Sequence, residues 1–500
     1  MRVRWRPAPR VAARWAVAAP SLLLAVVATV GLGHQPLWYD EIATVTVARR
    51  SVPHIFALLG HTDAVLGPYY LFMHAWTEAG TASWWVRTPS VLAGVLTVAL
   101  TAWLGLRLRG PLVGLLGGVL LALNPFFVFY ARDARPYTMV AAACVGTAHL
   151  LVFRPAVASR RRRTAWVAAA TGAVYLHLFA GLVVGAQAMR LLVERAARRW
   201  RAALVAVPLL AAPMAWAALH EQNEIGWLHR AAPWTYLSAF SAISGGVGLA
   251  VLAGVLAVAA VALAKDRLTS RWLLGWAMLP TLVLVTVSLL HPVFVARYVL
   301  GSLPAISLLA AIGAVELSRA AFDRWRMLAR LAAAGAVLAS LVVGGTAVAA
   351  EQHRPYFYED MPAAVDLVLD GSHAGDGIAY LSGTVRMSAR YYLPSVDPGA
   401  PRPQDVLFAR GQTGPLTGTF GGRMVHPGQA VDEVAEHGRV WVLQWKHARP
   451  SHLDGEVLTL LDRRYHVVER RLFGQAEVTL WQRGAPAIAS AAAPPPVRPA

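Results

Sequence analysis

Long apolar segments separated by short polar loops occupy the first 350 residues of the chain. A helix of about 20 apolar residues spans a bilayer core, and nine segments approach that length. They cover residues 15–33, 84–106, 112–130, 138–153, 202–219, 236–264, 272–290, 298–318 and 331–350. A further apolar stretch, between Arg163 and Arg190, is long for one helix and basic at both ends, so two short helices meeting near His177 are expected. The pattern predicts about eleven spans.

From residue 351 the pattern changes to that of a small α/β domain. Helix-like periodicity covers residues 360–369, 428–436 and 452–462, and strand-like runs cover residues 377–381, 439–445, 465–473 and 476–481. We therefore predict a transmembrane domain over residues 1–350 and an α/β domain over residues 351–484. The end of the chain, residues 485–500, is rich in Ala and Pro and is predicted to be disordered.

The composition agrees with a polytopic α-helical membrane protein. Of the 500 residues, 57% are hydrophobic and only 15% are charged, whereas soluble domains carry about a quarter charged residues. This balance argues against a cytosolic globular enzyme, and it excludes a disordered chain. The single cysteine, Cys144, excludes a disulfide framework and a cysteine-based zinc cluster.

The distribution of charge predicts an orientation. Of the 46 Lys and Arg residues, 31 precede residue 351, against 11 acidic residues there; from residue 351 onward the numbers are 15 and 16. Alternate loops of the apolar part hold the arginine clusters, at residues 2–14, 107–109, 154–163, 190–201, 265–271 and 319–330. The positive-inside rule makes these loops cytoplasmic. The N-terminus is then inside, the first segment is an uncleaved anchor, and the C-terminal α/β domain is extracytoplasmic.

Most acidic residues of the apolar part lie in or beside the outer loops, and hardly any ionisable group lies within a span. Ion-coupled transporters usually need such groups near the bilayer midplane. No glycine-rich phosphate loop stands between a strand and a helix, so no soluble nucleotide site is indicated. Any chemistry is therefore expected at the outer surface.

The first outer loop opens with Leu37-Trp38-Tyr39-Asp40-Glu41. A carboxylate at this place could accept a proton from an incoming hydroxyl as a general base, or it could hold a divalent cation. The alternative is an ordinary juxtamembrane charge pair with Trp38 and Tyr39 in the aromatic belt of the membrane.

The same loop continues with Asp63 and then Gly67-Pro68-Tyr69-Tyr70. Gly-Pro favours the start of a helix, and the aromatic residues that follow could lie in the interface and guide a lipid chain. A loop helix packed on its neighbours explains the pattern equally well.

Arginines in outer loops depart from the positive-inside pattern. Arg132 and Arg135 occur in Tyr130-Ala131-Arg132-Asp133-Ala134-Arg135-Pro136-Tyr137, and Arg297-Tyr298 stands near another helix end. The planar guanidinium suits phosphate recognition. Alternatively, Asp133 pairs with an arginine and the others extend to lipid headgroups. His177 is either a site residue or a structural histidine in apolar surroundings.

Taken together and in this order, these motifs resemble the membrane-embedded GT-C glycosyltransferases, and among them the family 39-like group related to protein O-mannosyltransferases and the lipid A aminoarabinose transferase. The resemblance covers residues 15–350. Its further carriers are His74-Ala75-Trp76, Arg87-Thr88-Pro89-Ser90, Asn124-Pro125-Phe126, Tyr175-Leu176-His177-Leu178-Phe179 and Phe294-Val295-Ala296-Arg297-Tyr298. Relatives more often have Asn-Pro-Pro where this chain has Gly67-Pro68, and many have Gln-Glu-Ala-Arg where it has Arg132-Asp133-Ala134-Arg135.

The resemblance implies transfer of a sugar, mannose or a similar one, from a polyprenyl-phosphate donor to an envelope glycan, lipid or protein acceptor, with inversion. Asp40 would be the base, with Glu41 and Asp63 orienting it or the acceptor. Arg132, Arg135 and Arg297 would bind the donor phosphate. Tyr69, Asp133, Tyr137, His177 and Tyr298 are further candidates, and some relatives use a divalent metal.

A flippase or transporter of lipid-linked sugar is the competing interpretation, because it would use the same arginines without needing Asp40. A third is a glycan-binding scaffold, for which eleven spans are excessive. The composition, heavy in Ala, Arg and Pro, indicates a high-GC bacterium and hence the bacterial cytoplasmic membrane. Because the charges beyond residue 351 are balanced, that part is expected to tune acceptor binding or stability and to hold no essential catalytic group.

Overall fold

The chain forms two compact units in the computed structural model, which describes residues 10–153, 155–220, 228, 230–320, 326–356, 358–393, 402–446 and 451–484. Unit 1 comprises Met1–Gln35 and Leu59–Arg354, and unit 2 comprises Pro36–Leu58 and Pro355–Ala500. The sequence assigned residues 36–58 to the transmembrane domain, whereas in the structure they pack within unit 2. The predicted disordered tail, residues 485–500, lies outside the described residues.

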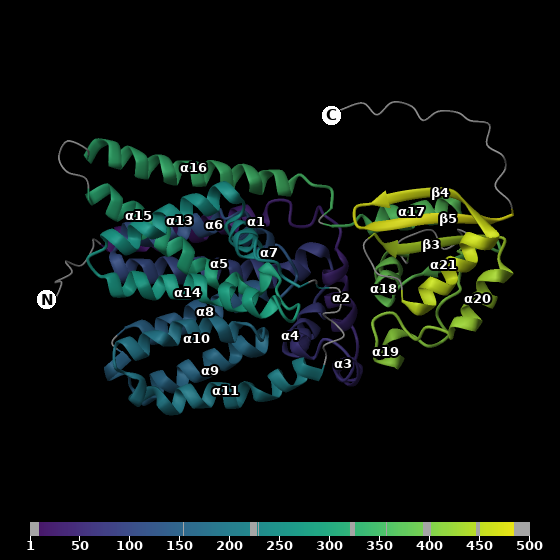
Figure 1. Cartoon of the computed structure of the whole chain (residues 1–500), viewed down its shortest axis with the longest axis horizontal. Helices are drawn as coiled ribbons and strands as arrows, with labels where there is room; N and C mark the ends of the chain where they lie inside the picture. Colours follow the sequence, from purple (N-terminus) through teal and green to yellow (C-terminus); the bar gives the residue numbers. More distant parts are fainter. Residues whose placement is uncertain are drawn as a thin grey trace. The chain divides into compact units, whose positions relative to one another are not determined.

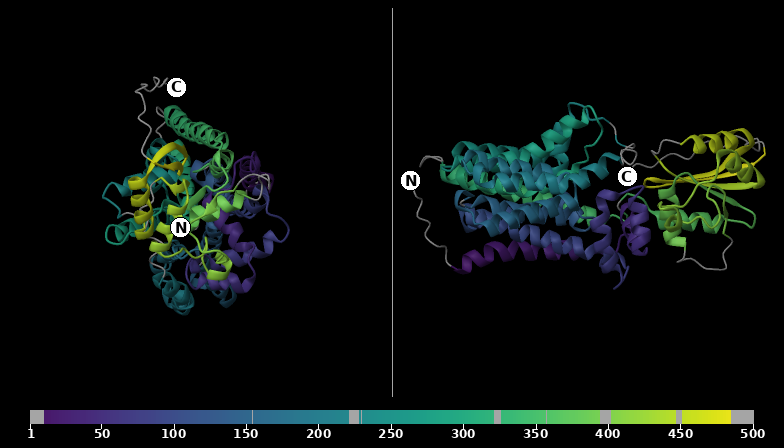
Figure 2. Two further views of the ribbon diagram at one scale, coloured as in Figure 1. Left: turned by 90° about the vertical axis from the view of Figure 1, so that its right-hand side faces the viewer. Right: turned by 90° about the horizontal axis from the view of Figure 1, so that it is seen from below.

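Unit 1 is a bundle of helices, most of them roughly parallel to one another (Figures 1 and 2). Short 3-10 helices connect some of them: η1 (Ala64–Leu66), η2 (Pro155–Val157) and η4 (Ala296–Ser302). The α-helices are α1 (Arg10–Thr29), α4 (Gly67–Thr77), α5 (Ser83–Arg109), α6 (Pro111–Ala122), α7 (Pro125–Ala131), α8 (Tyr137–Val152), α9 (Arg160–Leu176), α10 (Ala180–Val193), α11 (Ala197–His220), α12 (Thr235–Ser244), α13 (Val247–Leu263), α14 (Arg267–Ser288), α15 (Leu303–Ala320) and α16 (Arg326–Gln352).

Five helical stretches in the described part of the chain are long and apolar enough to cross a membrane: α1, α5, α11, α14 and Ala296–Arg319. The pairs α6–α7 and α12–α13 are long enough only together, and counting each pair as one span gives seven. Helices α8, α10 and the stretch Val337–Gln352 are apolar but shorter. The expected total of about eleven spans stays a prediction.

Two segments predicted to be continuous are broken in the structure. The α6–α7 pair bends by 68° at Leu123–Asn124, because Pro125 favours an extended conformation in the residue before it and starts a new helix capped by Asn124. The α12–α13 pair bends by 92° at Gly245 and Gly246, whose positive φ angles favour glycine. The predicted hairpin is confirmed, since α9 ends directly before His177 and α10 begins at Ala180.

Small residues let the helices of unit 1 approach closely. In α15, a Cβ atom added to Gly313 would lie 1.8 Å from the carbonyl oxygen of Leu256 in α13. Such backbone proximity is typical of helix packing in membranes, where burial of apolar surface provides little driving force. One hydrogen-bonded polar contact joins α8 and α10: Thr147 donates to Gln187 (2.8 Å), and Gln187 donates to the Cys144 carbonyl (2.9 Å).

Unit 2 is built on a five-stranded sheet of order β2-β1-β3-β5-β4, in which β1 is parallel to β2 and β3, and β5 is antiparallel to β3 and β4. Helices α17 and α18 contact each other on one face, and α20 and α21 do so on the other (Figure 2). The elements are α2 (Tyr39–Ala48), α3 (Val52–Leu59), α17 (Met361–Gly371), β1 (Gly377–Tyr380), α18 (Gly383–Tyr392), β2 (Gln404–Asp405), α19 (Gly414–Thr417), α20 (Pro427–Glu436), β3 (Arg439–Trp445), α21 (His452–Arg464), β4 (Tyr465–Phe473) and β5 (Ala476–Arg483).

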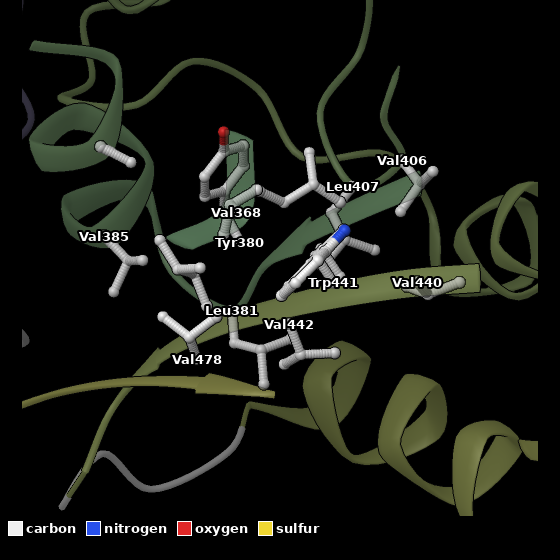
Figure 3. Close-up of a cluster of buried hydrophobic side chains, with 14 of the residues drawn as sticks. Val368, Tyr380, Leu381, Val385, Val406, Leu407, Val440, Trp441, Val442 and Val478 are labelled. Carbon is white, nitrogen blue, oxygen red and sulfur yellow. The ribbon is translucent and has the colours of Figure 1, made fainter. Parts of the chain in front are cut away.

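The core of unit 2 lies between the sheet and its helices (Figure 3). All four residues of β1 are buried, as expected for a strand covered on both faces. The Trp441 ring lies among aliphatic side chains, and its indole N–H donates to Asp376 (3.2 Å). The four predicted strands and three predicted helices of this unit are confirmed to within a few residues, whereas α2, α3, α18, α19 and the two-residue β2 were not predicted.

Candidate active site

The segment between α7 and α8 places Arg132, Asp133 and Arg135 inside unit 1. Pro136 ends this segment and α8 starts at the next residue. Arg132 is 3% exposed, Asp133 is fully buried and Arg135 is 7% exposed. The interpretation that the two arginines extend to lipid headgroups is therefore wrong, because both side chains are enclosed by protein.

Arg132 holds the end of a helix that is distant in sequence. Its guanidinium donates to the carbonyl oxygens of Ala28 (3.2 Å), Val30 (2.5 Å) and Gly31 (3.1 Å), at and just beyond the C-terminus of α1. The last carbonyls of a helix lack intrahelical donors, and a cation there is favoured by the helix dipole. Arg132 thus fixes the point at which the chain leaves α1.

Arg135 lies among side chains rather than on a helix end. Its backbone is tied to α5, since the Ser90 hydroxyl donates to its carbonyl oxygen (3.0 Å). Tyr70 of α4, one of the predicted motif residues, donates to the Asp63 carboxylate (2.5 Å). Burial raises the pKa of the Tyr70 phenol well above its ordinary value, the Asp63 charge adds to the rise, and the neighbouring Arg135 opposes it. Arg135, Tyr70 and Asp63 therefore form one connected group.

A ring cluster extends this group towards η4. The His177 ring lies 4.7 Å from the Tyr298 ring and 5.8 Å from the Tyr137 ring, between centroids. The Arg297 guanidinium lies 5.7 Å from the Tyr298 ring centroid and 5.9 Å from that of Tyr137. At such distances the ring faces attract the cation. The structure thus gathers Tyr137, His177, Arg297 and Tyr298, which are far apart in sequence.

His177 lies near both arginines of the cluster. It lies in the short connection outside α9 and α10, where burial lowers its pKa and the charges of Arg297 and Arg135 lower it further. The ring is therefore neutral at physiological pH. Tyr69, the remaining candidate of unit 1, is 1% exposed and lies 6.4 Å from the Tyr70 ring.

Asp40 and Glu41 lie in the first turn of α2, within unit 2. Both are buried, with exposures of 3% and 0%. Acidic residues in the first turn are stabilised by the helix dipole. Glu41 also accepts the Trp38 N–H (3.4 Å) directly before the helix, a reciprocal capping contact. Glu41 thus has a structural role at the helix start in addition to the catalytic role predicted for it.

A third carboxyl group, which the sequence analysis missed, joins them. Glu359 is 2% exposed and accepts the Tyr39 N–H of α2 at 2.6 Å. Burial raises the pKa of Glu359 to about 8, the charges of Asp40 and Glu41 add to the rise, and the Tyr39 N–H opposes it. Glu359 therefore carries a proton at neutral pH. Its signal in the sequence is Tyr358-Glu359-Asp360, a second aromatic–acid–acid run.

The candidate residues thus fall into two groups, one in each unit. Unit 1 holds the predicted arginines, Asp63, Asp133, His177 and the tyrosines; unit 2 holds Asp40 and Glu41. No group of three or more His, Cys, Asp or Glu side chains with metal-binding geometry occurs among the described residues. Those residues do not fit a metal held by three side chains, so no step is derived through one.

Solved structures with the same fold are found among membrane enzymes. The chain matches ArnT from Cupriavidus metallidurans, in the apo state and bound to undecaprenyl phosphate, with a TM-score of 0.55 and 14% identity over 93% of this chain and 97% of that chain. It also matches the archaeal oligosaccharyltransferase AglB from Archaeoglobus fulgidus, in complex with an inhibitory peptide and a dolichol-phosphate, with a TM-score of 0.50 and 9% identity over 86% of this chain and 69% of that chain. No family model and no curated protein matches the sequence.

These matches establish the fold. The chain is an α-helical membrane protein of the GT-C type with a small C-terminal α/β region, and the predicted fold class is confirmed. The match to ArnT covers 93% of the chain, so it includes residues of both units.

Proposed function

We propose that the chain is a membrane glycosyltransferase that moves a sugar, mannose or a similar one, from a polyprenyl-phosphate donor to an acceptor hydroxyl on the outer face of the cytoplasmic membrane. The observation that carries the proposal is the GT-C fold, shared over almost the whole length with ArnT, which was solved with undecaprenyl phosphate. The buried charges of both units support it, because they have the signs that phosphate binding and hydroxyl deprotonation require.

The donor phosphate is assigned to the cationic cluster of unit 1. Arg135 and Arg297 supply charge and planar donors that suit phosphate oxygens. The rings of Tyr137 and Tyr298 lie beside Arg297, and the neutral His177 lies beside both rings; such rings lower the local dielectric and strengthen a phosphate contact. Arg132 supports the same site through the end of α1. As the sugar leaves, negative charge grows on the bridging phosphate oxygen, and the arginines stabilise it.

Asp40 is assigned the role of base. The acceptor oxygen attacks the anomeric carbon from the face opposite the phosphate, the carbon–oxygen bond to the phosphate breaks, and Asp40 takes the hydroxyl proton. Polyprenyl phosphate leaves with the bonding electrons, and the anomeric configuration inverts. Glu41 and Asp63 orient neighbouring groups. A flippase of lipid-linked sugar would need the arginines but no base, so Asp40 separates the two functions.

The orientation belongs to the same proposal and has its own test. Val157 (64% exposed) follows α8 in a predicted inner loop, and Asp462 in α21 is exposed in unit 2. Cysteines introduced at these two positions in a Cys144→Ser background are probed with a membrane-impermeant thiol reagent on intact cells. Labelling at position 462 alone is expected. Labelling at position 157 alone would show that the chain has the opposite orientation.

The substrate class is tested in a deletion strain. Mass spectrometry of its cell-envelope glycans, lipids and glycoproteins is expected to show loss of one hexose- or pentose-bearing species. The wild-type gene should restore the species and Asp40→Asn should not. An unchanged envelope, together with no transfer by the purified protein from polyprenyl-phosphate mannose or arabinose to envelope extract, would contradict the proposal.

A further inference from the structure

The first turn of α2 depends on a group from the far end of the chain. The first N–H groups of a helix have no partner within the helix, and in α2 the first of them, from Tyr39, donates to Glu359 (2.6 Å). Glu359 follows Asp40 by more than 300 residues in sequence. The residue that orients the start of this helix therefore belongs to the C-terminal part of unit 2.

The sheet fixes Glu359 in place. Glu359 forms a β-bridge with Gly474, which lies in the turn between β4 and β5. On either side of it, the Asp360 N–H donates to the Phe473 carbonyl (3.2 Å) and the Gln475 N–H donates to the Tyr358 carbonyl (2.9 Å). At Gly474 the φ angle is +66°, and an added Cβ would lie 2.2 Å from the Tyr358 carbonyl oxygen. Only glycine allows this approach, so the backbone of Glu359 is held tightly against the β4–β5 turn.

Aromatic contacts flank the hydrogen bond on both sides. The Trp38 and Tyr358 rings lie 4.6 Å apart and the Tyr39 and Trp445 rings 5.7 Å apart, between centroids. Such pairs contribute beyond their buried area. They hold the entry to α2 against the rest of unit 2, and because Glu359 is buried, its contact with Tyr39 lies in a low dielectric that strengthens it.

We propose that Glu359 is a positioning residue: by accepting the Tyr39 N–H it fixes the first turn of α2, and with it the carboxylate of Asp40. The part of this inference that concerns catalysis rests on the proposed function, whereas the part that concerns α2 does not. The C-terminal part of unit 2 then positions the proposed base and is required for catalysis, rather than being an accessory domain.

The protonation of Glu359 sharpens the inference. Asp40, Glu41 and Glu359 lie close together, and three buried negative charges would repel one another. At neutral pH Glu359 is uncharged, and its carbonyl oxygen still accepts the N–H. A glutamine has the same shape, the same acceptor and no charge, so Glu359→Gln should preserve the arrangement and Glu359→Ala should not.

The test compares hydrogen exchange in the full-length protein in lipid nanodiscs. In Glu359→Ala the amides of residues 39–48 are expected to exchange about tenfold faster, since a buried hydrogen bond is lost; Glu359→Gln should match the wild type. The matched control is Glu477→Ala. Glu477 is also buried in this sheet, but it pairs with Arg470 (2.7 Å), so its loss should not speed exchange in α2.

Transfer from polyprenyl-phosphate mannose supplies the second measurement. A misplaced base should lower kcat of Glu359→Ala by about 10- to 100-fold, with the donor KM unchanged and Glu359→Gln close to the wild type. Unchanged exchange in Glu359→Ala, equal loosening in Glu477→Ala, or a loosened Glu359→Gln would overturn the inference. If Glu359→Ala does not fold, Glu359→Gln alone decides it. If Asp40→Asn keeps its rate, the assignment of Asp40 as the base fails, while the exchange data still test the role of Glu359 in α2.

Discussion

Two segments, one in each unit, carry a pair of like charges. In each pair, one side chain is hydrogen-bonded to the backbone that flanks a helix end. In unit 2, Glu41 caps the start of α2 whereas Asp40 lies buried beside Glu359. In unit 1, Arg132 holds the end of α1 whereas Arg135 lies beside Tyr70. A charge committed to backbone groups is costly to redirect to a substrate, while a charge among side chains can respond to one. We therefore expect Glu41 and Arg132 to govern stability, and Asp40 and Arg135 to govern activity.

The largest effect is expected for Asp40→Asn. The amide keeps the shape of the side chain and loses the basicity that takes the hydroxyl proton, so kcat for transfer from polyprenyl-phosphate mannose should fall by about 10²–10⁴. Binding of undecaprenyl phosphate, measured by thermophoresis, should stay within about twofold. Glu41→Gln is the partner control, and it should lower thermal stability more than rate. Nearly wild-type transfer by Asp40→Asn would end the assignment and make Asp63 the next candidate.

Arg135→Ala should have the next largest effect, on affinity. Removing a charged donor from a buried phosphate site costs about 1.5–3 kcal/mol, so the dissociation constant for undecaprenyl phosphate should rise about 10- to 100-fold. Arg135→Lys keeps the charge without the planar fork and should fall between Ala and the wild type. If Arg135→Ala binds undecaprenyl phosphate as tightly as the wild type, the phosphate binds elsewhere, and Arg297 is the next residue to examine.

Arg132→Ala should separate from Arg135→Ala by a loss of stability. The carbonyls at the end of α1 would lose their donors, at a cost of about 1–2 kcal/mol, and the melting temperature should fall by several degrees. Undecaprenyl phosphate affinity of the folded fraction should change little. The two variants should therefore show opposite effects, with lower stability in Arg132→Ala and lower affinity in Arg135→Ala. A large affinity loss in Arg132→Ala with an unchanged melting temperature would reverse the roles given to the two arginines.

The same comparison shows which features could be predicted from sequence. The contact of Glu41 is local, because a glutamate at the third helical position commonly caps the helix start, and it was open to prediction. The contact of Arg132 with α1 joins residues about 100 positions apart, and no short-range pattern signals it. Helix periodicity and loop charge indicated the fold class because they depend only on neighbours in the chain.

The position of residues 36–58 was missed for a similar reason. Their apolar and aromatic residues suit a membrane interface as well as a protein core, and long-range contacts such as those with Tyr358, Glu359 and Trp445 distinguish the two. These contacts also change the expectation for the part beyond residue 351. A chain that ends there would lack the partners of α2, so it should lose transfer completely.

The smallest expected effect is a pH dependence of stability from Glu359. Its folded pKa of about 8 exceeds the ordinary value of 4.5, so the folded chain keeps a proton that the unfolded chain releases. This contribution to stability is fully present below pH 4.5 and declines as the pH rises to about 8. The glutamine of Glu359→Gln does not titrate. Subtracting the melting temperatures of this variant from those of the wild type at each pH therefore removes the contribution of the other ionisable groups. The melting temperature of the wild type should therefore fall relative to Glu359→Gln by about 2–4 °C per pH unit between pH 5 and 8. A difference independent of pH would mean that neither burial nor the charges of Asp40 and Glu41 raise the pKa of Glu359, and the acidic group of unit 2 would then lose its electrostatic contrast with the cationic cluster of unit 1.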